Sequence, residues 1–98
     1  MLHKEKHIIS PETFLLIQKL QTLPELKDFF LVGGTALALQ IGHRNSIDID
    51  LFTQNDLDAQ SLTAFLRTKF NVRIDHSGVN TLLTLINNIK VDFIKHPY

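Results

Sequence analysis

Three aspartates and one glycine turn are the residues whose types and spacing point to chemistry. Asp48 and Asp50 lie in the segment 47–52, where they alternate with apolar residues. This period of two predicts a strand with one face in the core, so the two carboxylates share the other face, roughly 7 Å apart. At an effective dielectric of about 20 they repel by about 2 kcal/mol, and a divalent cation between them would reverse that sign. The simpler interpretation is a solvent-exposed strand face that carries two charges.

A two-glycine turn precedes the two aspartates by about fourteen residues. The apolar run 29–32 predicts a buried strand, and Gly33 and Gly34 follow it where the chain must turn. Thr35 is placed to cap a short helix, expected over residues 36–41. Free N–H groups at a helix start favour a phosphate. A Gly-Gly turn alone is more often structural, but together with the aspartates it favours a site for a metal-bound nucleoside triphosphate.

A third carboxylate, Asp92, fits the same scheme. Two β-prone runs, 81–86 and 89–94, are joined by Asn87-Asn88. This pair suits a tight hairpin because Asn tolerates positive φ. If the last strand pairs beside the strand of the other two aspartates, the three carboxylates converge. A lone acid in a strand is otherwise more often a plain surface residue.

The remaining pattern supplies the elements that must position these groups. Ser10 and Pro11 mark a helix start, and Pro24 ends that helix. A second helix is expected from about residue 58 to residue 69, and a short strand over 72–75. The order helix, strand, helix, strand, helix and three strands predicts an α/β (α+β) fold, in which helices pack on one side of a mixed sheet.

The composition is that of an ordinary globular protein. The chain has 98 residues, 44% hydrophobic and 20% charged, and we expect one domain over 1–98 with a solvated arm at 1–9. A net charge of zero argues against coating of nucleic acid, though not against a small RNA held by a local patch. There is no cysteine, signal peptide or run of transmembrane length. A cytoplasmic protein without a membrane partner is therefore expected.

The motif region resembles a known family. The sequence Gly-Gly-Thr-Ala-Leu-Ala-Leu is followed by His43-Arg44-x-Ser46 and then by Asp-Ile-Asp-Leu-Phe. Together with the later hydrophobic-Asp-hydrophobic strand, it resembles the nucleotidyltransferase fold of the DNA polymerase β superfamily. Within that superfamily it looks most like the AbiEii/AbiGii toxin group of bacteria. The resemblance covers about residues 10–98 and implies a polymerase β-like core.

The resemblance also implies a role for each matched residue. Asp48, Asp50 and Asp92 would be the catalytic carboxylates that bind Mg²⁺ or Mn²⁺, and Asp92 would also help to deprotonate the attacking hydroxyl. The implied nucleotide-binding residues, which would lie near the phosphates, are Gly33, Gly34, Thr35, Arg44 and Ser46.

The implied activity is Mg²⁺-dependent transfer of a nucleoside monophosphate from an NTP to a hydroxyl of RNA or protein. The setting would be a toxin-antitoxin or phage-defence system, with a cognate antitoxin as partner. Proteins of this group continue into a helical region that contributes substrate-binding residues, whereas this sequence stops at Tyr98. Activity of this chain alone is left open, and self-association is expected. The alternatives are a truncated, non-catalytic nucleotide-binding or protein-interaction domain, and a minimal nucleotidyltransferase antitoxin.

Overall fold

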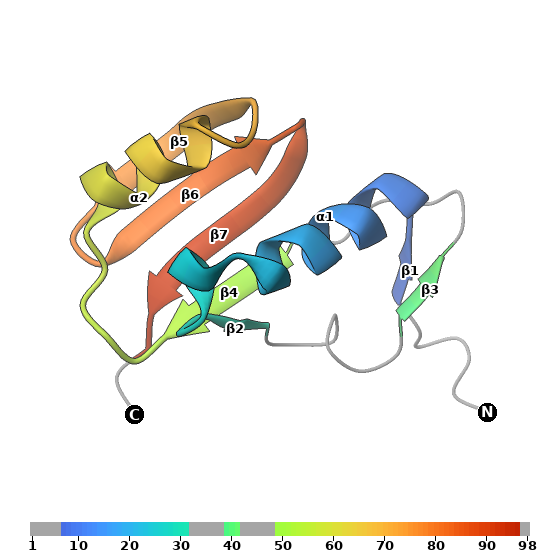
Figure 1. Ribbon diagram of the computed structural model, residues 1–98, viewed down its shortest axis with the longest axis horizontal. Coiled ribbons are helices and arrows are strands. Elements are labelled where there is room, and N and C mark those ends of the chain that lie inside the picture. The colour runs from blue at the N-terminus through green and yellow to red at the C-terminus, as the bar shows by residue number, and fades with distance from the viewer. Residues whose placement is uncertain (1–6, 32–38, 42–48, 97–98) are drawn as a thin grey trace.

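The computed structural model describes residues 7–31, 39–41 and 49–96. The helical elements within these ranges are α1 (Pro11–Thr22), the 3-10 turn η2 (Pro24–Leu26) and α2 (Ala59–Arg67). The strands are β1 (His7–Ile9), β2 (Phe30–Leu31), β3 (Leu39–Ile41), β4 (Ile49–Thr53), β5 (Val72–Gly78), β6 (Thr81–Ile86) and β7 (Ile89–Lys95). Figure 1 shows these elements along the chain.

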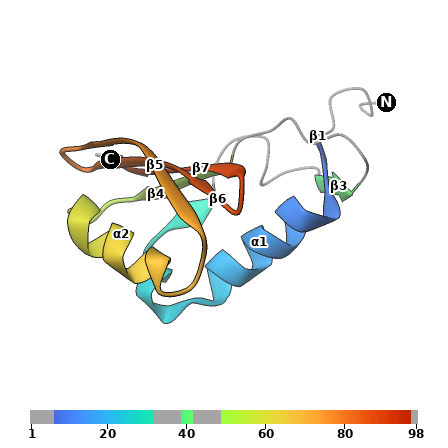
Figure 2. The ribbon, with the colours of Figure 1, turned by 90° about the horizontal axis from the view of Figure 1, so that it is seen from above.

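Five of the strands form one mixed sheet in the order β2-β4-β7-β6-β5. The central pair, β4 and β7, is parallel, and the other neighbouring pairs are antiparallel. Both helices lie on the same side of this sheet (Figure 2). The predicted α+β fold, a mixed sheet with helices on one side, is therefore confirmed.

Local sequence signals begin both helices. The Ser10 hydroxyl accepts a hydrogen bond from the Thr13 backbone N–H, and a proline occupies the first turn of α1. In α2 the Asp58 carboxylate accepts from the backbone N–H groups of Gln60 and Ser61. These side chains satisfy N–H groups that have no partner inside a helix.

The core lies between the helices and the facing side of the sheet. In β4 and β7 every second residue is buried, because successive strand side chains point to opposite faces. Phe93 is fully buried, and its ring meets that of Phe29 edge-on with centroids 5.5 Å apart. The buried hydrophobic residues of the sheet are Ile49, Leu51, Val72, Leu82, Ile86, Ile89, Val91 and Phe93. Those of the helical elements and the loop before α2 are Leu16, Ile17, Leu20, Leu26, Leu57 and Leu66.

The hairpin between β6 and β7 forms as its sequence predicts. Asn87 and Asn88 have φ of 52° and 68°, the left-handed region that Asn tolerates better than most residues. The side-chain oxygen of Asn87 also accepts a hydrogen bond of 3.2 Å from the backbone N–H of Asn71. This bond ties the turn to the start of β5 and so helps to fix the register of the last three strands.

Two segments near the N-terminus differ from expectation. Residues 39–41 were expected to end a helix but form β3, and residues 7–9 were expected in a solvated arm but form β1. These two strands pair in parallel, His7 with Leu39 and Ile9 with Ile41. Pairing with a segment distant in sequence overrides a weak local helix preference. Strand β5 also runs further than expected, to Gly78.

Candidate functional site

Asp50 lies on β4, the second strand of the five-stranded sheet. This strand is flanked by β2 on one side and by β7 on the other. Ile49 and Leu51 are buried on the helix-covered face, whereas Asp50 is half-buried on the opposite face. We call this opposite face, which carries Asp50 and Asp92, the open face. The backbone of Asp50 pairs with that of Asp92 in β7, and a strand holds a side chain more firmly than a loop would.

Asp92 lies directly opposite Asp50. The parallel pairing of β4 with β7 makes the two residues Cα partners, and both side chains belong to the open face. Neighbouring strands are about 4.8 Å apart, so two carboxylates meet at nearly one level of the sheet. At an effective dielectric of about 20, charges about 5 Å apart repel by about 3 kcal/mol. Such a pair needs positive charge nearby.

Lys90 supplies positive charge at this point. Its ammonium group forms an ion pair with the Asp92 carboxylate, and the two side chains are 33% and 16% exposed. Lys90 matches no residue of the family motif, although a spacing of two within a strand predicts that its side chain and that of Asp92 share a face.

The other predicted site residues lie outside the described residues. They are Gly33, Gly34, Thr35, Arg44, Ser46 and Asp48. Within the described ranges, no three His, Cys, Asp or Glu side chains gather as a metal-binding group. The structure thus brings together two of the three predicted carboxylates, and the roles of all eight residues stay predictions.

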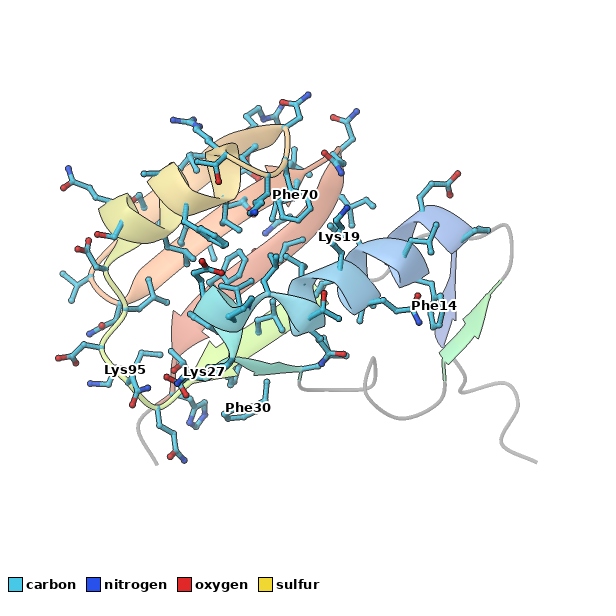
Figure 3. The ribbon with its side chains drawn as sticks, viewed as in Figure 1. Phe14, Lys19, Lys27, Phe30, Phe70 and Lys95 are labelled. Carbon is cyan, nitrogen blue, oxygen red and sulfur yellow. The ribbon has the colours of Figure 1, made fainter. Side chains whose placement is uncertain are left out.

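An aromatic group lies at the end of the same face. Phe52 follows Asp50 by two residues, is the Cα partner of Phe30 in β2, and stacks on the His96 ring with centroids 5.1 Å apart. Phe30 is 40% exposed, and Figure 3 labels it on the edge strand β2. Flat apolar side chains therefore border the carboxylate pair on the side toward the end of β4.

A second group of acids lies elsewhere in the fold. A hollow of about 350 Å³ between η2 and α2 is lined by Glu25, Asp56 and Asp58 together with aromatic side chains, among them Phe29 and Phe65. Neither Asp50 nor Asp92 lines it. The hollow is therefore separate from the open face.

Two of the three acids in the hollow already have strong partners. Asp56 accepts a hydrogen bond of 2.8 Å from Lys95, which lowers the pKa of the Asp56 carboxyl. Asp58 caps α2, and the hydrogen bond from the Ser61 hydroxyl lowers the pKa of the Asp58 carboxyl. Asp58 thus caps a helix and Asp56 is an exposed ion-pair partner, and among the described residues the acids of the hollow do not gather as a metal-binding group.

The donor set on the open face suits a hard divalent cation. Mg²⁺ prefers oxygen ligands and is commonly held by one or two carboxylates plus substrate phosphates. Asp50 and Asp92 provide two carboxylates at one level of a rigid sheet. A divalent ion here would also remove the repulsion between them, so the residues fit the metal that the sequence predicted.

Comparison with known proteins assigns the chain to a family. The family described as "Nucleotidyl transferase AbiEii toxin, Type IV TA system" matches residues 15–93. The chain therefore belongs to the AbiEii family of nucleotidyl transferase toxins, as its motifs predicted. No described helix is long and apolar enough to cross a membrane.

A curated relative is an uncharacterized protein of Aquifex aeolicus (strain VF5). It is 34% identical over 84 residues, which are 84% of this chain and 41% of the relative. The chain thus spans well under half the length of this relative. No solved structure matches. The likeness to polymerase β therefore stays a prediction from the sequence motifs.

Proposed function

We propose that this protein is an Mg²⁺-dependent nucleotidyltransferase that moves a nucleoside monophosphate from an NTP to an acceptor hydroxyl. The observation that carries the proposal is the parallel register that sets Asp50 beside Asp92 on the open face. Membership of the AbiEii family supports the same reaction class.

Each residue has a part in the proposed reaction. Asp48, Asp50 and Asp92 hold the metal, which when bound neutralises charge on the triphosphate and on the attacking oxygen. Asp92 accepts the proton of the acceptor hydroxyl. The acceptor oxygen then bonds to the α-phosphorus, the bond to the β-phosphate oxygen breaks, and pyrophosphate leaves. Gly33 and Gly34 approach the triphosphate through their backbone.

Phosphate contacts from Thr35, Arg44 and Ser46 complete the proposed nucleotide site. The acceptor is an RNA or a protein, and the setting is a type IV toxin-antitoxin system with a cognate antitoxin as partner. The family's description as a toxin of such systems supports this setting.

A stability measurement tests the nucleotide site. Urea unfolding is followed with and without each NTP plus Mg²⁺, for the wild type and for Asp50→Asn/Asp92→Asn. A ligand at about 100 times its Kd adds about 2.7 kcal/mol to the free energy of unfolding. We expect this gain in the wild type and its loss in the double variant.

A matched control removes two charges elsewhere. Asp28 and Asp75 are paired with Lys27 and Arg73 in more exposed positions, so Asp28→Asn/Asp75→Asn should keep the gain. Transfer is then measured with α-labelled NTP and RNA or protein acceptors. A stability gain without transfer would favour the non-catalytic nucleotide-binding alternative, and no gain with any NTP would contradict the nucleotide site itself.

A further inference from the structure

Lys90 and Asp92 form an unusual ion pair for this protein. Among the ion pairs of the described residues, the partner carboxylates Asp28, Asp75 and Asp56 have side chains that are 54%, 35% and 92% exposed. Asp92 is only 16% exposed. A carboxylate taken this far from water needs a partner, because the ionised form is otherwise strongly disfavoured.

The need is greater because of Asp50. Its Cα lies directly across from that of Asp92 in the neighbouring strand, and both side chains share the open face. Two negative charges meet there, and Lys90 brings a positive charge to the same face. Its ammonium is a compact charge on a flexible stem of four carbons, which can withdraw without any movement of the strand.

We propose that Lys90 is a built-in counter-ion of the carboxylate pair, which binds Asp92 in the metal-free protein and is displaced when a divalent cation binds. This inference rests on the proposed metal site. The ammonium group and the cation compete for the same carboxylate, so Lys90 weakens metal binding while it stabilises the metal-free fold.

The experiment measures Mn²⁺ affinity and unfolding together. Mn²⁺ binding is followed by electron paramagnetic resonance for the wild type, Lys90→Met and Asp50→Asn/Asp92→Asn. Methionine keeps most of the apolar stem and removes the charge. We expect Lys90→Met to bind Mn²⁺ about tenfold more tightly than the wild type, since the competing charge is gone. We also expect it to unfold at a lower urea concentration without metal.

Lys95→Met is the matched control. It removes one positive charge from the same strand, but Lys95 pairs with the exposed Asp56 at the far end of β7 (Figure 3). Its Mn²⁺ affinity should stay within about twofold of the wild type. If Lys90→Met does not fold, Lys90→Gln removes the same charge and keeps a polar side chain. We expect this variant also to bind Mn²⁺ about tenfold more tightly than the wild type.

The outcomes separate the inference from the proposed function. Tighter Mn²⁺ binding on loss of Lys90, but not of Lys95, supports the counter-ion role. Equal or weaker binding in a folded Lys90 variant, with binding in the wild type abolished by Asp50→Asn/Asp92→Asn, overturns it and leaves the metal site standing. No Mn²⁺ binding by either the wild type or the Lys90 variants overturns both.

Discussion

The two faces of the central sheet use the same strands in opposite ways. On the helix-covered face, Ile49, Val91 and Phe93 are fully buried. On the open face, the residues between them include Asp50 and Asp92, which are only half-buried. Because strand side chains alternate, one short segment supplies both sets. Core residues and candidate site residues therefore alternate along the same strands instead of occupying different segments of the chain.

Truncation of a buried side chain in the central strands is expected to change stability most. Phe93→Ala removes a fully buried ring that contacts Phe29 and should lower the free energy of unfolding by about 3–5 kcal/mol. Ile94→Ala, one residue further on the open face, should cost about 1 kcal/mol, since that side chain is only partly buried. Urea unfolding of both variants measures the difference, and equal losses would contradict the separation of the two faces.

The smallest expected effect concerns pH and the helix-covered side. The Ser61 hydrogen bond lowers the pKa of Asp58 in the folded protein, so folding favours the ionised carboxylate. This stabilisation is fully present above the unfolded pKa of about 3.9 and is lost as the pH falls through the lower folded value. The stability difference between wild type and Asp58→Asn should therefore be constant near neutral pH and shrink in acid. Urea unfolding of both proteins at a series of pH values measures this stability difference. A difference that does not change with pH would contradict a lowered pKa of Asp58 in the folded protein.

Sequence patterns predicted the elements of this fold better than their pairing. Ser10 and Asn87-Asn88 act through neighbouring backbone, so their helix cap and hairpin turn could be predicted. The alternation of apolar and polar residues around Asp92 also predicted which residues share its face of the sheet. The pairing of β1 with β3 depends on partners distant in sequence, and no local signal in residues 39–41 indicates it.

In the candidate site too, the strands could be predicted from local sequence but their pairing could not. The sequence predicted that Asp50 and Asp92 each lie on a strand. It could not predict that these two strands are neighbours, because the alternation of apolar and polar residues does not determine the order of strands in a sheet. The structure supplies the parallel register that sets them opposite each other. The spacing of two between Lys90 and Asp92 could have predicted that the two side chains share a face and form an ion pair. The strength of its pairing depends on burial, which the sequence pattern does not give.

The central claim is that the open face at the β4–β7 pair binds the divalent metal. The most direct test is the paramagnetic broadening of backbone amide NMR signals by substoichiometric Mn²⁺. We predict broadening that is strongest at Asp50 and Asp92, weaker in α1 and α2 on the other side of the sheet, and absent in Asp50→Asn/Asp92→Asn. Broadening centred on Asp56 and Asp58 at the start of α2, or no localised broadening, would contradict the claim.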